Sequence, residues 1–190
     1  SSYRKGIYPE YKQNRKDKFE LQTEAERIQF EIFFQEFEKA LALLQFNNDD
    51  FFIIETEEEA FIFEGNEEEA RSEFLDDIEG TEEADIDANF LIYCQNNLTE
   101  VEEYDENDYN NDYLVLTDDE ANEKWEEALD SYLEECVYPE LPSNMQNYFD
   151  DEAWKRDARY DGRGHSLSMY DGHENEEVVN DTTYYIYRQN

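Results

Sequence analysis

The chain carries an excess of negative charge that limits which folds it can adopt. Its 190 residues include 53 Asp and Glu against 15 Lys and Arg, which gives a formal net charge of −38. Self-repulsion of this size destabilises compact states, and a small domain needs a net charge of only about 2–8 to stay soluble. High charge usually indicates disorder, but 13 Phe and 15 Tyr can bury large areas. We therefore expect a folded core under a highly acidic surface.

The charge is distributed unevenly along the chain. Residues 1–18 have a net charge of +4, and we expect a basic flexible arm there. Residues 19–154 hold 44 acids and four cations, a net charge of −40, whereas residues 155–190 have a net charge of −2. Forty charges equal the phosphates along about 70 Å of duplex DNA. A charge run is usually a solvated face, but this density favours a functional role.

The charge and the composition exclude several classes of protein. Phosphate groups repel the acidic body, so we expect it to bind neither nucleic acid nor an anionic membrane surface. The sequence has no apolar run of membrane-spanning length and no signal-peptide pattern, so we expect a protein of the host-cell cytoplasm. Two Cys without a CxxC motif exclude a disulfide scaffold and a structural zinc module.

Hydrophobic periodicity and turn residues predict an α+β fold with several amphipathic helices, short antiparallel strands and a β-rich C-terminal end. The predicted helices cover residues 23–46, 67–79, 117–136, 143–149 and 151–159. The apolar run in residues 86–98 fits a helix or a strand, and we favour the helix. The predicted strands cover residues 51–54, 60–63, 113–116, 166–170 and 182–187. We predict four regions, namely the basic arm 1–18, an acidic α+β domain 19–100, an acidic loop 101–112 and an α+β domain 113–190.

Metal-binding patterns are weak in this sequence. Asp105, Asn107 and Asp112 are spaced loosely like the ligands of a calcium loop, but Asn110 replaces its glycine and Leu116 its final Glu. His165, His173 and Asp171 fit no standard metal spacing. We expect no metal and no cofactor.

Nucleophile patterns are equally weak. Cys94 and Cys136 stand among apolar residues, so we expect buried, unreactive thiols. We expect no enzyme activity, and an unrecognised catalytic site around Asp161, His165 and Asp171 is the alternative.

The acids between residues 55 and 108 are the candidate partner-binding residues, because Arg71 is the only cation between Ala40 and Glu123. We expect their carboxylates to stand in for DNA phosphates, with an affinity that falls as salt screens the charges. Tyr104, Tyr109 and Tyr113 would add cation–π contacts to arginines of a partner. The candidate acids are Glu55, Glu57, Glu58, Glu59, Glu67, Glu68, Glu69, Asp76, Asp77, Glu82, Glu83, Asp85, Asp87, Glu102, Glu103, Asp105, Glu106 and Asp108.

Residues 140–157 resemble the last domain of ArdA-type antirestriction proteins. The shared positions are Pro142, Gln146, Asn147, Tyr148, Asp150, Ala153, Arg156 and Asp157. Residues 161–172 and 184–188 are similar to the tails of small acidic phage proteins of unknown function. The first resemblance implies an elongated acidic mimic of bent duplex DNA that occupies the DNA sites of restriction enzymes.

Charge and resemblance together predict an acidic DNA-mimic protein of phage or mobile-element type. It would inhibit a DNA-binding host defence protein, a restriction enzyme or CRISPR nuclease, by occupying its cationic DNA site. The alternative is a phage interaction or assembly factor that binds basic proteins without DNA mimicry. Two interpretations of the basic arm stay open, namely contact with nucleic acid through its tyrosines and folding back onto the acidic body. The oligomeric state stays open as well.

Overall fold

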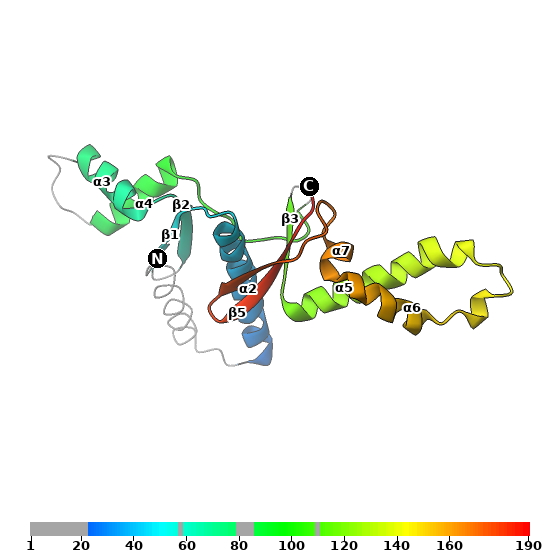
Figure 1. The fold of residues 1–190 in the computed structure, drawn as a ribbon. Helices are drawn as coiled ribbons and strands as arrows, with labels where there is room; N and C mark the ends of the chain where they lie inside the picture. Colours follow the sequence, from blue (N-terminus) through cyan, green and yellow to red (C-terminus); the bar gives the residue numbers. More distant parts are fainter. Residues whose placement is uncertain (1–22, 57–58, 79–85, 109–110) are drawn as a thin grey trace. The chain divides into compact units, whose positions relative to one another are not determined.

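A computed structural model describes residues 23–56, 59–78, 86–108 and 111–190, and the predicted basic arm lies outside them. Helices and short antiparallel strands form an α+β fold, as the sequence predicts (Figure 1). The chain divides into two compact units, which we call unit 1 (Ser1–Tyr104) and unit 2 (Asp105–Asn190). This division falls inside the segment that the sequence predicts as an acidic loop, 101–112.

Unit 1 contains the longest helix, α2 (Glu24–Phe46), among the described residues, and it matches the predicted helix 23–46. The Thr23 side chain caps it by accepting a hydrogen bond of 3.1 Å from the backbone N–H of Glu26. Most of the second half of the helix is buried, whereas Ile28 and Ile32 in the first half are exposed. The apolar stripe of the sequence is therefore buried mainly toward its C-terminal end.

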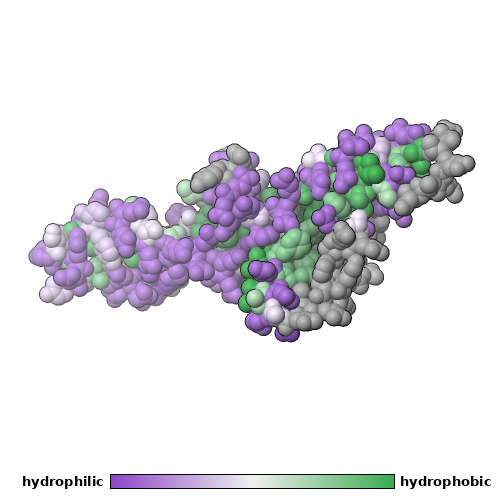
Figure 2. All heavy atoms as spheres, turned by 180° about the vertical axis from the view of Figure 1, so that it is seen from behind, coloured by the Kyte–Doolittle hydropathy of each residue, from purple (hydrophilic) through white to green (hydrophobic). Residues whose placement is uncertain are grey.

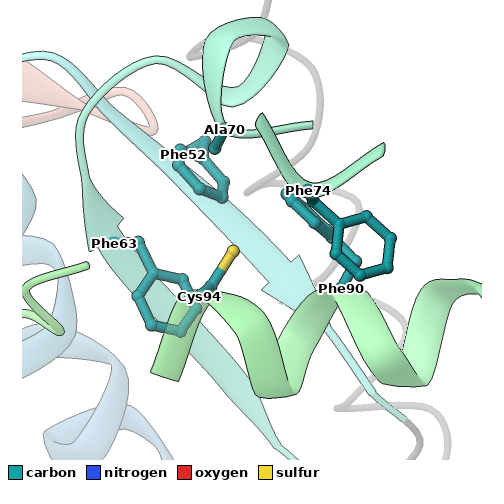
Figure 3. Close-up of a cluster of buried hydrophobic side chains, with 6 residues drawn as sticks. All are labelled: Phe52, Phe63, Ala70, Phe74, Phe90 and Cys94. Carbon is teal, nitrogen blue, oxygen red and sulfur yellow. The ribbon is translucent and has the colours of Figure 1, made fainter. Parts of the chain in front are cut away.

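The core of unit 1 lies between a hairpin and two helices. Strands β1 (Phe51–Glu55) and β2 (Ala60–Glu64) pair antiparallel, and helices α3 (Glu67–Asp77) and α4 (Ile86–Asn97) follow. The structure thus confirms the predicted strands and helices of this segment, with small shifts at their ends. Figure 3 shows the cluster that joins them, formed by Phe52, Phe63, Ala70, Phe74, Phe90 and Cys94.

Unit 2 is built on a three-stranded antiparallel sheet in the order β3 (Tyr113–Leu116), β5 (Thr182–Arg188), β4 (Asn175–Val179). Asn180 and Asp181 have φ angles of 49° and 64° and form the turn between β4 and β5. Asn and Asp tolerate this backbone conformation better than most residues do. Strands β3 and β5 are predicted from sequence, whereas β4 is not, because its Asn-Glu-Glu start has a low strand propensity.

Two antiparallel helices extend from this sheet (Figure 1). Helix α5 (Asp118–Tyr132) begins with a full capping box between Thr117 and Glu120, and it continues as the π-helix η1 (Leu133–Val137). Helix α6 (Asp151–Ala158) returns toward the sheet and confirms the predicted helix 151–159. The predicted helix 117–136 is confirmed as far as Tyr132.

Two predicted elements of unit 2 are wrong. Residues 163–167 form the short helix α7 (Arg163–Leu167), so the predicted strand 166–170 does not exist. A Cβ at Gly164 would lie 2.5 Å from the carbonyl oxygen of Gly172, so glycine lets α7 approach that backbone closely. The predicted helix 143–149 is reduced to the 3₁₀ turn η3 (Gln146–Tyr148), because residues 143–145 form a turn. In the first segment close packing overrides the local pattern, whereas in the second the Gln146 side chain bonds to the nearby Tyr138 carbonyl.

Candidate partner-binding surface

Helix α3 carries five of the candidate acids. Asn66 caps it by accepting a hydrogen bond of 3.1 Å from the backbone N–H of Glu69. Ala70 and Phe74 are buried in the core, so the opposite side of the helix faces solvent. The exposed candidate acids of α3 are Glu68, Glu69, Asp76 and Asp77. The helical rise of about 1.5 Å per residue separates the first pair from the second by about 12 Å.

The acids in the last turn of α3 do not stabilise the helix. Asp76 and Asp77 stand there, and this turn contains no basic residue. A carboxylate at a helix C-terminus interacts unfavourably with the helix dipole, which costs about 0.3–1 kcal/mol of helix stability. The stability of α3 therefore does not explain why these two residues are acidic.

Arg71 lies near the carboxylates of two other candidate acids, Glu67 and Asp87. Its Nε lies 3.1 Å from Glu67 Oε1, its Nη1 lies 4.0 Å from Asp87 Oδ1, and its guanidinium stacks on the Phe90 ring at 4.3 Å. The Glu67 side chain is only 12% exposed, so Glu67 supports the helix and contributes little to a docking surface. Asp87 is almost fully exposed and remains accessible to a partner.

The hairpin between β1 and β2 places further acids on the surface. Glu55 and Glu59 are exposed on either side of the turn. Thr56 closes this turn, because its backbone N–H donates to the Glu59 carbonyl and its side-chain hydroxyl accepts from the Glu59 N–H. The neighbouring candidates Glu57 and Glu58 lie outside the described residues. The same is true of Glu82, Glu83 and Asp85 between α3 and α4.

The candidate acids of the loop 101–112 are exposed. They are Glu102, Glu103, Asp105, Glu106 and Asp108. The Asp105 carboxylate accepts a 2.9 Å hydrogen bond from the backbone N–H of Asn107 and thereby holds the loop in a turn. Glu106 Oε2 lies 3.7 Å from Lys124 Nζ, and desolvation raises the pKa of Glu103. The loop acids therefore differ in their surroundings. Asp105 accepts a hydrogen bond within the loop, Glu106 pairs with a lysine, and Glu103 is partly desolvated.

The two described tyrosines of the candidate docking group, Tyr104 and Tyr113, are not exposed. Tyr104 is buried, and its ring lies 5.8 Å from the Lys39 ammonium of α2. Tyr113 is half-buried on β3, and Tyr109 lies outside the described residues. The expectation that Tyr104 docks on a partner is wrong, because its ring packs inside unit 1.

A row of ion pairs joins α6 and α7 to α5. It is not among the features predicted from the sequence. Lys155, Arg159 and Arg163 follow one another every four residues. Lys155 pairs with Asp130, Arg159 Nη2 lies 2.6 Å from Glu126 Oε1, and Arg163 Nη1 lies 2.7 Å from Asp118 Oδ1. The equal spacing of these cations is the signal that could have predicted this row. Unit 2 thus uses its cations to hold its own helices together.

The two cysteines differ in exposure. Cys94 is buried as predicted, and burial raises the pKa of its thiol to about 11. The prediction that Cys136 is buried is wrong, because its side chain is exposed. Cys136 lies in the π-helix η1, whose wider turn shifts the residues after Leu133 out of the α-helical periodicity on which that prediction rests.

The residues of the alternative catalytic site do not form a connected group. Asp161, His165 and Asp171 are all exposed. Asp171 accepts hydrogen bonds of 2.8 Å from Ser168 Oγ and 3.0 Å from the His173 N–H, which hold the pKa of its carboxyl below the usual value. Within the described ranges, no three or more His, Cys, Asp or Glu side chains are placed to hold a metal ion.

Comparisons of the chain with known proteins identify no relative. No family model, curated protein or solved structure matches the chain significantly. The resemblance of residues 140–157 to ArdA-type proteins therefore stays an expectation. In the part of the chain that the structure describes, every helix is too short or too polar to cross a lipid bilayer.

Proposed function

We propose that this chain is an acidic protein that inhibits a DNA-binding protein by occupying its cationic DNA site. The α3 acids and the acids of the loop 101–112 would take the places of DNA phosphates. The target would be a host defence nuclease, a restriction enzyme or a CRISPR nuclease, in the cytoplasm of the host cell. The chain itself would perform no catalysis.

The observation that carries this proposal is the exposed, un-neutralised charge of α3. Among the described residues, no ion pair joins Glu68, Glu69, Asp76 or Asp77 to a cation. Asp76 and Asp77 also oppose the helix dipole, so folding alone does not account for them. Charges that cost stability and face solvent are available for a cationic partner.

Two variants with equal changes of charge test the proposal. The first replaces the α3 acids (Glu68→Gln, Glu69→Gln, Asp76→Asn and Asp77→Asn). The control replaces four exposed acids of unit 2 (Glu123→Gln, Glu127→Gln, Glu176→Gln and Asp181→Asn). Tagged wild type and both variants are used at low salt to capture binding proteins from a bacterial lysate, with and without excess duplex DNA.

We expect the wild type to recover a DNA-binding protein that duplex DNA displaces. The α3 variant should bind it about fourfold or more weakly, because four exposed charge pairs contribute about 0.2–1 kcal/mol each. The control variant should retain most of the binding. Equal losses in both variants would show that only total charge matters. Partners that DNA does not displace would favour the assembly-factor alternative, and either result would refute DNA mimicry through α3.

A further inference from the structure

The segment that joins the π-helix η1 to α6 exposes apolar side chains. We call residues 138–150 the tip loop, and Figure 1 shows them at the end of unit 2 that lies away from its sheet. Tyr148 is 83% exposed and Met145 is 51% exposed. Tyr and Met are enriched in protein–protein interfaces relative to the rest of a protein surface.

The tip loop is held in place by contacts among its own residues. Gln146 Nε2 donates a 2.9 Å hydrogen bond to the Tyr138 carbonyl, and the Tyr138 hydroxyl donates to the Asp151 carboxylate at the start of α6. The rings of Tyr138 and Phe149 meet edge to face at 6.1 Å. A loop that is already ordered loses little conformational entropy when it binds a partner.

The charge around the tip loop has one sign. Every charged residue from Glu126 to Trp154 is acidic. Exposed acids lie on η1 just before the tip loop and on the loop itself, namely Glu134, Glu135, Glu140 and Asp150. A negative field around an accessible aromatic ring favours a cation that can also stack on that ring.

Among the described residues, arginines stack more closely on tyrosine rings than lysine does, since the Lys39 ammonium lies 5.8 Å from the centroid of the Tyr104 ring. The Arg188 guanidinium lies 3.8 Å from the centroid of the Tyr170 ring, and the Arg163 guanidinium lies 4.4 Å from that of Tyr185. The planar guanidinium stacks on an aromatic face, whereas the ammonium of lysine is a compact, strongly hydrated charge.

We propose that the tip loop docks onto a protein surface that presents arginine side chains, with Tyr148 as the stacking platform and Met145 beside it. The exposed acids around the loop attract the partner, and the ring discriminates arginine from lysine. This contact involves unit 2 and does not depend on the proposed role of the α3 acids.

Selective ¹³C labelling of the methionine methyl groups tests this proposal on the full chain. The chain has two methionines, and Met169, which is 77% exposed outside the tip loop, serves as an internal control. The probes are octa-arginine and octa-lysine peptides at near-physiological salt. Tyr148→Ala removes the platform, and Tyr160→Ala, at an equally exposed tyrosine (85%) outside the tip loop, is the matched control.

We expect octa-arginine to shift the Met145 signal at about two- to fivefold lower concentration than octa-lysine, the range for one exposed stacking contact. Tyr148→Ala should abolish this difference, whereas Tyr160→Ala should preserve it. Equal responses to both peptides, or equal effects of the two Tyr variants, would overturn the proposal. A Met145 shift that appears on concentrating the protein alone would assign the loop to self-association and would overturn it as well. None of these results depends on competition by DNA.

Discussion

At the scale of single residues, burial separates side chains that the sequence treats alike. Cys94 and Cys136 have similar apolar neighbours in sequence, yet Cys94 is buried and Cys136 is exposed. Glu67 and Glu68 are adjacent acids, yet Glu67 pairs with Arg71 and Glu68 faces solvent. The role of each residue follows from the side of the helix that packs against the core.

This difference predicts which thiol reacts in the folded protein. A thiol reagent at mildly alkaline pH should modify Cys136 rapidly and Cys94 slowly, because only a thiolate reacts and burial raises the pKa of Cys94 to about 11. The thiolate fraction of Cys94 should be roughly a hundredfold lower than that of an ordinary cysteine. Absorbance of the released thiol chromophore follows the reaction.

The control for this experiment is Cys136→Ser, which should remove the rapid phase while leaving the slow phase. Denaturation of that variant should then make one thiol reactive. Rapid modification of the Cys136→Ser variant in its native state would contradict the burial of Cys94.

At the scale of helices and strands, caps and hydrophobic periodicity predict most elements, and long-range contacts decide the rest. Thr23 caps the start of α2 with one hydrogen bond, and Thr117 with Glu120 caps the start of α5 with a full box. Helix α7 replaces a predicted strand because Arg163 ties it to distant residues. Arg163 forms a two-point pair with Glu174, at 2.8 Å and 3.2 Å, and bonds to Asp118 of α5.

Removing the ion pairs of Arg163 with Asp118 and Glu174 should destabilise unit 2. Arg163→Met leaves the carboxylates of Glu174 and Asp118 without their cation, and we expect the free energy of unfolding to fall by about 2 kcal/mol. Urea denaturation followed by circular dichroism measures this change. Arg156→Met is the matched control, since the Arg156 side chain is exposed and pairs only with its neighbour Asp157 at 3.4 Å among the described residues.

We expect the control to change the free energy of unfolding by no more than about 0.5 kcal/mol, as for most surface substitutions. Equal changes in the two variants would mean that the ion pairs of Arg163 do not hold α7 in place.

At the scale of the whole molecule, apolar clusters in each unit are surrounded by an excess of acid. Figure 2 shows hydrophilic residues over much of the visible face, with hydrophobic residues between them. Unit 1 packs a cluster of aromatic side chains between its hairpin and helices, and unit 2 packs Leu116, Ala121, Leu167 and Tyr187 between sheet and helices. Each core must offset the mutual repulsion of the surrounding carboxylates.

This repulsion predicts how salt affects stability. Raising NaCl from about 0.01 M to about 0.5 M shortens the Debye length from about 30 Å to a few Å, so we expect the melting temperature to rise by several degrees. Differential scanning calorimetry measures this rise. The α3 variant with four neutralised acids should show a smaller rise and a higher melting temperature at low salt.

A melting temperature that falls with added salt would mean that ion pairs outweigh the repulsion. Salt should act in the opposite direction on the proposed binding, because it screens attraction to a cationic partner. The two effects of salt can therefore be measured separately.

The sequence by itself determines the α+β class, most of the extent of helices α2, α3, α5 and α6 and the strong asymmetry of charge. These features follow from neighbours along the chain, since caps and periodicity act over a few residues and charge depends on composition alone. The tertiary structure decides which of the many acids face solvent without a cation. It also buries Tyr104, exposes Tyr148 and pairs Lys155, Arg159 and Arg163 with α5. The burial of Tyr104 and the exposure of Tyr148 depend on tertiary packing, which no local pattern specifies. The four-residue spacing of the three cations is visible in the sequence, but their partners on α5 are not.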